Sequence, residues 1–254
     1  MVRLLSGLVL GTAAVAAVLF LPATGLLLVA CAVAWLAASE YQRLVNASVS
    51  LHWAAALVCY LVGSRAYGEA TFGVLLVVVG YAVAGAVLLR DDTLGRAAAA
   101  AFGLIYVAVP LGALVLVHRL GGAEAVLLLI FTIVVSDSAQ YYTGRLVGRR
   151  PLAPAISPKK TVEGALGGVL IGTAFVVVAG RIVFPFVRPP QLVALGLALV
   201  ALGIAGDLFE SRLKRTAGLK DSSRLIPGHG GLLDRIDALL FAIPVYYLFV
   251  NEVM

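Results

Sequence analysis

The chain has 254 residues, of which 62% are hydrophobic and 13% are charged, and its mean hydropathy is +1.05. This composition excludes an ordinary soluble domain and indicates a polytopic membrane protein with a formal net charge of +6. Both cysteines, Cys31 and Cys59, lie in apolar runs, so we expect neither a disulfide framework nor a redox centre.

Nine apolar runs approach the roughly 17 to 25 residues that a membrane-spanning helix needs. Because a second apolar run follows the first almost at once, we interpret the first as a retained helix and not as a signal peptide. The eighth run is short, and we expect its helix to continue past Asp207 through Arg215 into the aqueous phase. The predicted fold class is therefore all-α, a polytopic integral membrane protein with about nine transmembrane helices. In chain order, the runs cover residues 4–20, 23–39, 47–63, 70–89, 97–117, 125–144, 164–184, 192–205 and 236–250.

Positive charges predict how these runs are oriented, because cytoplasmic loops are enriched in Lys and Arg. With the amino terminus inside and nine alternating runs, fifteen of the 19 Lys and Arg fall inside and four outside. Six of the fifteen belong to segment 206–237 and could serve substrate binding, but without them the division is still nine to four. The sequence therefore predicts that both polar loops, 145–163 and 207–235, face the cytoplasm.

Polar residues are concentrated in the carboxy-terminal half. We divide the chain into an amino-terminal transmembrane region, 1–122, and a carboxy-terminal catalytic region, 123–254. Within the latter, segment 206–237 carries five of the 13 acidic residues together with six cations. Carboxylates bind hard cations, and Lys and Arg bind phosphate, so this composition predicts metal-assisted phosphoryl or nucleotidyl transfer in a polar cavity on the cytoplasmic side.

Spacing within the segment strengthens this prediction. Asp207, Glu210, Ser211 and Lys214 stand at i, i+3, i+4 and i+7, which places them on one face of a helix. A solvated helix end with ordinary ion pairs would have the same spacing. The following PGHGG stretch, however, permits close backbone approach and positive backbone angles, and such turns expose amides that suit phosphate oxygens.

The residues from Ser211 to Asp237 match, at the same spacing, the pattern SxxKRxxxxKDxxxxxPxHGGxxDRxD. This pattern resembles the signature of the phosphatidate cytidylyltransferases, also called CDP-diacylglycerol synthases. Asp137 and the stretch SPKKTVE, Ser157 to Glu163, resemble a second block of that family. Where the family pattern has Asp-Thr, this chain has Asp137 followed by Ser138, which keeps the hydroxyl. The first five runs resemble the family only in being apolar.

The resemblance implies that CTP and phosphatidate give CDP-diacylglycerol and pyrophosphate, in phospholipid biosynthesis, with Mg²⁺ required and a second cation left open. A lipid phosphate oxygen is already ionised at neutral pH, so positioning and charge neutralisation are the main catalytic tasks. CTP, phosphatidate and membrane lipids are the expected partners, and nucleic acid is not. The expected location is a prokaryotic plasma membrane, with the active site facing the cytoplasm.

Asp207 and Asp234 are the predicted metal ligands, because one closes a membrane helix and the other opens the next. For each aspartate, a structural ion pair is the alternative. Asp221 and Asp237 are reserves, either as ligands or as partners that orient Lys220 and Arg235. For His229 we favour a loop or phosphate-contact role. The predicted catalytic residues are Lys214, Arg215, Lys220, Asp221, His229, Arg235 and Asp237, and the predicted substrate-binding residues are Asp137, Lys159, Lys160, Ser211, Gly230 and Gly231.

Asp137 follows eleven largely apolar residues, and an acid at depth in a membrane span is a functional hypothesis by default. It either lies at the floor of the polar cavity or pairs with Arg145 two turns on. Gly164, Gly168 and Gly172 form a stripe of small residues that lets helices approach closely. We expect this stripe to pack within the chain, while a homodimer stays open.

Two other functions are weighed against this one. A transporter or channel could carry an acid at depth and glycine-rich helices, but it would not require five carboxylates and six cations beside PGHGG. A transferase acting on another lipid, such as an archaeal ether-lipid phosphate or a polyprenol, is closer. The residues of segment 206–237 suit contacts with phosphate groups, and they give little information about which lipid tail is bound.

Overall fold

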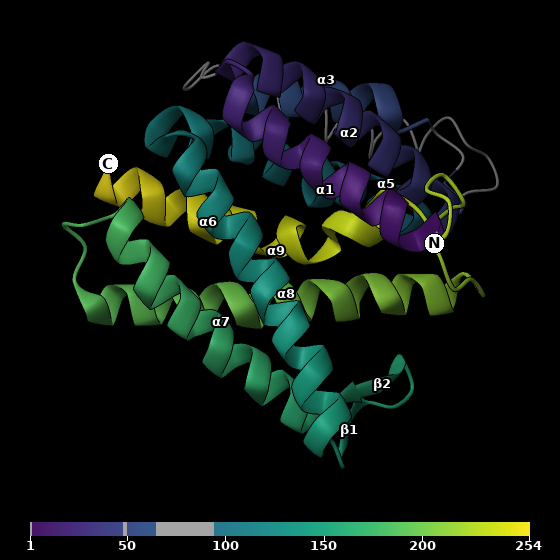
Figure 1. Cartoon of the computed structure of the whole chain (residues 1–254). Helices are drawn as coiled ribbons and strands as arrows, with labels where there is room; N and C mark the ends of the chain where they lie inside the picture. The colour runs from purple at the N-terminus through teal and green to yellow at the C-terminus, as the bar shows by residue number, and fades with distance from the viewer. Residues whose placement is uncertain (1, 48–49, 65–93) are drawn as a thin grey trace.

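The computed structural model describes residues 2–47, 50–64 and 94–254, which form helices and one short hairpin (Figure 1). The predicted span 70–89 lies outside these described residues. Three amino-terminal helices lie on one side of the molecule and contact the long middle helix, and the second and third of them also pack against each other. They are α1 (Val2–Phe20), α2 (Ala23–Leu44) and α3 (His52–Gly63).

The middle of the chain forms a long helical run with a kink. It consists of α5 (Leu94–Gly103), a π-helical turn (Leu104–Ala108) and α6 (Val109–Val147). The apolar part, 98–147, has 50 residues. As one straight helix it would be about 75 Å long, well over the roughly 30 Å of a bilayer core. Gly122, with φ 70° and ψ −172°, interrupts the helix and divides this run at the boundary between the predicted spans 97–117 and 125–144.

A β-hairpin follows α6, inside the segment that the sequence predicted only as a loop. Strands β1 (Pro151–Ala153) and β2 (Ser157–Thr161) pair antiparallel, with Pro151 opposite Thr161 and Ala153 opposite Ser157. The strands have three and five residues, too few for a periodic pattern to be visible in the sequence. The fold is all-α apart from this hairpin, in the part of the chain that the structure describes.

Three further helices complete the fold: α7 (Val162–Val183), α8 (Pro189–Thr216) and α9 (Leu233–Val253). Helix α7 packs between α6 and α8, and α9 packs against α8 and α6. Helix α8 runs through Asp207 to Thr216, which confirms the expected continuation past the apolar run. Buried between α9 and α6, the Tyr246 hydroxyl donates to the carbonyl of Ala125 at 2.8 Å.

The glycine stripe of α7 packs within the chain, as expected. A Cβ added at Gly168 would lie 2.3 Å from Gln140 Cγ, and one at Gly172 would lie 2.7 Å from Val200 Cγ2. Gly164 would meet the backbone of Gln140 in the same way. Only glycine leaves room for α6 and α8 to approach α7 this closely.

Membrane-spanning capacity is confirmed for five helical segments of the described residues, at 23–44, 98–147, 162–183, 189–216 and 233–253. The segments 6–20 and 52–63 are shorter apolar helices. On α7, Leu170 is 71% exposed and Ile182 is 80% exposed, which suits an apolar face turned toward lipid. The protein is therefore an all-α integral membrane protein, while the number of nine spans stays a prediction.

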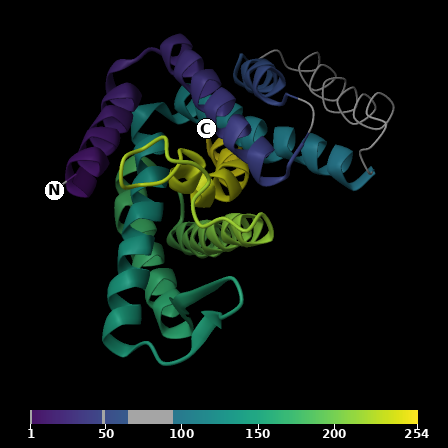
Figure 2. The same ribbon diagram turned by 90° about the vertical axis from the view of Figure 1, so that its right-hand side faces the viewer.

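The two polar segments lie on the same side of the molecule. The Arg215 side chain at the end of α8 donates from Nε to the carbonyl of Ile156 in the hairpin at 3.4 Å. With that side toward the viewer, the hairpin lies at the bottom and the loop between α8 and α9 lies beside α1 (Figure 2). The fold thus places the hairpin and the loop before α9 at one end of the helices.

Candidate active site

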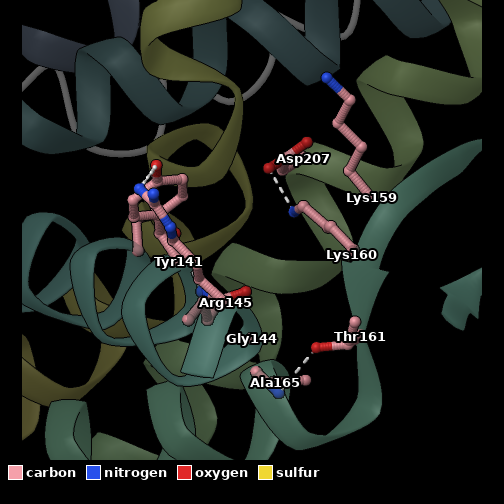
Figure 3. Close-up of a pocket in the computed structure, with 11 residues that line it drawn as sticks. Tyr141, Gly144, Arg145, Lys159, Lys160, Thr161, Ala165 and Asp207 are labelled. Atoms are coloured by element: carbon pink, nitrogen blue, oxygen red, sulfur yellow. Dashed lines mark hydrogen bonds and ion pairs between the residues drawn. The ribbon is translucent and has the colours of Figure 1, made fainter. Parts of the chain in front are cut away.

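A polar cavity of about 410 Å³ opens where α6, β2, the start of α7 and α8 meet (Figure 3). Three cations and two carboxylates contribute to its wall, so oppositely charged groups share one hollow. The lining residues are Asp137, Gln140, Tyr141, Gly144, Arg145, Lys159, Lys160, Thr161, Gly164, Ala165 and Asp207. Asp137, Lys159, Lys160 and Asp207 were predicted from the sequence, and the structure brings these four together.

Lys160 and Asp207 form the central contact of the cavity. The Lys160 ammonium makes an ion pair with Asp207 Oδ2, drawn as a dashed line in Figure 3. Ser211 Oγ donates to the other oxygen of Asp207, Oδ1, at 3.3 Å. Asp207 and Ser211 therefore share one face of α8, as the i, i+4 spacing predicted.

Hydrogen bonds around the SPKKTVE stretch direct the Lys160 side chain toward α8. The Thr161 hydroxyl caps α7 by accepting the amide of Gly164 at 3.1 Å. Glu163 Oε2 accepts the amides of Arg149 and Arg150 at 3.0 and 3.1 Å, and so fixes the chain that leaves α6. These bonds hold both ends of the hairpin, and β2 carries Lys160 into the cavity.

Asp137 lies in the wall of the cavity. Gln140 Nε2 donates to Asp137 Oδ1 at 3.0 Å, whereas Arg145 donates to the hydroxyl of Tyr141 at 3.2 Å. Of the two interpretations of Asp137, this geometry favours the cavity over a pair with Arg145. Asp237, in the first turns of α9, is not among the residues that line the cavity, and its Oδ1 accepts the amide of Ala238 at 2.8 Å. The roles of these carboxylates in binding stay predictions.

A second network surrounds Asp234. Lys214 Nζ lies 2.6 Å from Asp234 Oδ1 and also forms an ion pair with Glu210, whose side chain is fully buried. Asp234 Oδ2 accepts the amide of Gly231 at 2.7 Å and the amide of Ser222 at 3.0 Å. Both oxygens of Asp234 thus have protein partners, and the network links α8 to the start of α9.

Glu40, near the end of α2, belongs to the same network. Its buried carboxylate accepts hydrogen bonds from Ser222, Ser223, Leu232 and Leu233, which lie in the loop before α9 and at its start. Nothing in segment 206–237 identifies this partner from the amino-terminal half.

His229 is held by the first helix. Ser6 Oγ lies 2.8 Å from His229 Nδ1 and donates to the carbonyl of Pro227 at 3.1 Å. Gly230, with φ 78°, accepts the amide of Ile226 at 2.8 Å and closes a tight turn. This geometry agrees with the loop role that we favoured for His229, and its contact with phosphate stays a prediction.

Several predicted residues lie outside the lining of the cavity. Lys220, Asp221 and Arg235 are exposed. Arg215 is exposed and donates to the carbonyls of Ile156 and Leu219. The structure does not bring these four to the cavity, and their predicted roles stay predictions.

A family model described as the cytidylyltransferase family matches residues 1–253. The chain belongs to the cytidylyltransferase family. The match includes the first five predicted spans, for which the sequence had offered only apolar character. The cavity and the network around Asp234 are therefore parts of a cytidylyltransferase-family fold.

Curated relatives match shorter stretches. Phosphatidate cytidylyltransferase of Aquifex aeolicus is 46% identical over 125 residues, 48% of this chain and 45% of that protein. Phosphatidate cytidylyltransferase of Thermotoga maritima is 38% identical over 157 residues, 59% of this chain and 58% of that protein. The uncharacterized protein YnbB of Escherichia coli is 43% identical over 134 residues, 52% of this chain and 44% of that protein. The chain spans about half the length of the curated relatives it matches.

The predicted metal can be tested against the donor groups of this cytidylyltransferase-family fold. Among the described residues, no three His, Cys, Asp or Glu side chains are grouped as ligands of one ion. Mg²⁺ is usually held by one or two carboxylates together with substrate phosphates and water. Asp207 and Asp234 each place an oxygen against a lysine ammonium, and so against a cation. Asp207 lines the cavity, whereas Asp234 does not and has protein partners at both oxygens, so the role of these two carboxylates as Mg²⁺ ligands stays a prediction.

Glu40 is the residue that the sequence analysis missed. It lies in an apolar helix, four residues before that helix ends at Leu44. An acid in a membrane span is a functional hypothesis by default, and the sequence analysis applied this rule to Asp137 alone. The sequence feature that could have identified Glu40 was therefore a single charged residue in an apolar helix, outside every motif.

Proposed function

We propose that this protein transfers the cytidylyl group of CTP to phosphatidate, giving CDP-diacylglycerol and pyrophosphate. A phosphate oxygen of the lipid attacks the α-phosphorus of CTP, and the bond from that phosphorus to the oxygen leading to the β-phosphate breaks. Pyrophosphate leaves with the electron pair. The observation that carries the proposal is the cavity where Arg145, Lys159 and Lys160 meet Asp137 and Asp207 in a cytidylyltransferase-family fold. The relatives from Aquifex aeolicus and Thermotoga maritima are named for this activity.

The charges of the cavity suit a reaction between two anions. Phosphatidate and CTP repel each other, so cations must lower that repulsion before the reacting atoms can approach. Arg145, Lys159 and Lys160 contribute three positive charges to the lining of the cavity, and Lys160 pairs with the carboxylate of Asp207. The nucleophile is already ionised, which leaves positioning and charge neutralisation as the work of the protein.

Mg²⁺ is proposed as the metal of this reaction, with Asp207 and Asp234 as its protein ligands. When bound, it would neutralise charge on the phosphates. In the same proposal Lys160 and Lys214, which pair with these carboxylates, are available to the phosphates of the substrates. A second cation stays open.

The proposed site faces the cytoplasm of a prokaryote, where nucleoside triphosphates are present. Support for this orientation comes from charge, since in the predicted nine-span topology fifteen of the 19 Lys and Arg fall on the side of the two polar loops. A homodimer stays a proposal, and the glycine stripe gives it no support because Gly164, Gly168 and Gly172 are buried within the chain.

Label transfer by purified protein in detergent tests the reaction. CTP labelled at the α-phosphate should pass its label to a lipid product in the presence of phosphatidate and Mg²⁺. CTP labelled at the γ-phosphate should instead give labelled pyrophosphate, which separates cytidylyl transfer from phosphoryl transfer. Chelation of the metal should stop both.

Lys160→Met should abolish product formation, because it removes a cavity cation while keeping a long apolar stem. Arg181→Gln, which removes an exposed charge in the last turn of α7, is the matched control and should keep wild-type activity. Product from an ether-lipid or polyprenyl phosphate, but not from phosphatidate, would replace the proposed lipid. Label from the γ-phosphate in lipid would overturn the reaction type.

A further inference from the structure

The loop before α9 is fastened to the amino-terminal half by one buried carboxylate. Glu40 is 2% exposed, and its partners lie more than 180 residues further along the chain. Oε2 accepts the Leu233 amide at 2.7 Å and the Ser222 hydroxyl at 3.0 Å. Oε1 accepts the Ser223 hydroxyl at 2.7 Å and the Leu232 amide at 3.0 Å. Each carboxylate oxygen thus lies within hydrogen-bond distance of one amide and one hydroxyl group.

These contacts stabilise the start of α9 and not the end of α2. Glu40 lies near the carboxyl end of α2, where the helix dipole disfavours a negative charge. Leu232 is the N-cap residue of α9 and Leu233 is its first residue, and amides at this end of a helix have no partner within the helix. Helix α9 has no side-chain cap at Leu232. Glu40 supplies that cap from another helix, and its charge meets the positive end of the α9 dipole.

The Glu40 carboxylate is linked to Asp234 through the hydroxyl of Ser222. Ser222 Oγ lies 3.0 Å from Glu40 Oε2 and 2.9 Å from Asp234 Oδ2, and a hydroxyl has a single proton to donate. Asp234 in turn contacts Lys214. A continuous chain of polar contacts therefore runs from α2 through the loop to α8.

Gly231 shows how closely the parts of this chain fit. A Cβ at this position would lie 2.0 Å from Ser222 Oγ and 2.5 Å from Glu40 Oε2. Its amide donates to Asp234 Oδ2 at 2.7 Å. Glycine is required here because the two polar side chains fill the space beside it.

We propose that Glu40 is a positioning residue for the reaction proposed above. Its carboxylate orients Ser222 and fixes the start of α9, and so holds Asp234 against Lys214. This inference rests on the proposed function for its effect on turnover, but its effect on the loop does not depend on any substrate.

Glu40→Gln is the decisive variant, because it keeps the volume and removes the charge that the amides and hydroxyls of the loop surround. Glu40→Asp keeps the charge but withdraws it by one methylene. Glu124→Gln removes an exposed glutamate of α6 and serves as the matched control. Ser222→Ala, alone and combined with Glu40→Gln, tests whether the two residues act through one another.

For cytidylyl transfer, Glu40→Gln should lower kcat about 10- to 100-fold, the usual cost of losing a group that orients others. The KM for CTP should change far less, and Glu40→Asp should recover part of kcat. Because a merely destabilised protein would show normal kcat once folded, each rate is referred to folded protein measured by thermal unfolding. The double variant should resemble its worse single variant. Wild-type kcat in folded Glu40→Gln, or effects that simply add, would overturn the inference.

Hydrogen exchange of segment 222–233 gives a readout that needs no catalysis. Exchange there should be faster in Glu40→Gln than in wild type, while Glu124→Gln should leave it unchanged. Failure of the wild type to form product, combined with this faster exchange, would sink the proposed reaction and leave the fastening of the loop supported. Unchanged exchange in Glu40→Gln would sink the positioning role itself.

Discussion

At the scale of single residues, the candidate site rests on lysines paired with aspartates from distant parts of the chain. Lys160 and Asp207 are 47 residues apart, and Lys214 and Asp234 are 20 apart. A half-buried carboxylate without a partner is costly, so each lysine stabilises the aspartate that it meets. The same ammonium groups are of the right charge to contact phosphate. The stability of the fold and the proposed reaction therefore depend on the same lysine and aspartate side chains.

Asp234→Asn should abolish turnover and leave a folded protein in the membrane. The change keeps the side-chain volume but removes the charge that Lys214 meets at 2.6 Å, and one of the two oxygens that accept hydrogen bonds. We expect the rate of label transfer from CTP to fall at least 100-fold, or about 3 kcal/mol in transition-state free energy. Arg43→Gln, an exposed charge outside the motif, should keep activity. Near-normal turnover in Asp234→Asn would exclude this residue as a metal ligand.

At the scale of elements, the close packing of α6 and α7 sets the shape of the cavity. The two helices meet through the glycine stripe, and both contribute lining residues. The hairpin follows directly from α6 and leads directly into α7, so its direction depends on how these helices cross. The packing of an apolar interface thereby decides where Lys159 and Lys160 lie.

Gly168→Val should separate α6 from α7. Even its Cβ would lie 2.3 Å from Gln140 Cγ, and overpacking of this kind costs about 1–3 kcal/mol. We expect a lower unfolding temperature in detergent, together with lower activity because Gln140 lines the cavity. Leu170→Ala, on the exposed face of the same helix, should change the unfolding temperature little. Equal unfolding temperatures for the two variants would contradict the packing.

At the scale of the whole molecule, the positive charges and the positions of the helix ends both distinguish one side of the protein from the other. The hairpin and the loop before α9 lie at one end of the helices, and the connection 184–188 joins the other ends of α7 and α8 (Figure 1). If α7 spans the bilayer, its ends lie on opposite sides. The positive charges predict that the hairpin end faces the cytoplasm.

Cysteine accessibility in intact cells tests this orientation. With the native Cys31 and Cys59 replaced, Ala155→Cys in the hairpin and Leu225→Cys in the loop should resist a membrane-impermeant thiol reagent until the cells are opened. Phe186→Cys, an exposed position between α7 and α8, should react from outside. The reverse pattern would invert the topology, and labelling of all three from outside would contradict a spanning α7.

Among the described residues, the sequence by itself located the apolar helices, although the one predicted at 47–63 begins only at His52, and it identified the residues that resemble a cytidylyltransferase signature. The extension of α8 and the shared face of Asp207 and Ser211 followed from local rules, because helix periodicity depends only on neighbours in the chain. The strands of the hairpin at 151–161 are too short to produce a periodic pattern that those rules could detect. The division at residue 122 coincides with the kink at Gly122, and it stays a prediction.

Only the tertiary structure decided which carboxylate meets which donor. It brought Lys160 to Asp207 and Lys214 to Asp234, and it set His229 against Ser6. It also revealed Glu40, whose partners lie more than 180 residues away. The physical reason is that burial of apolar surface follows local composition, whereas a hydrogen bond requires two groups within about 3 Å. That distance is set by the packing of the whole molecule.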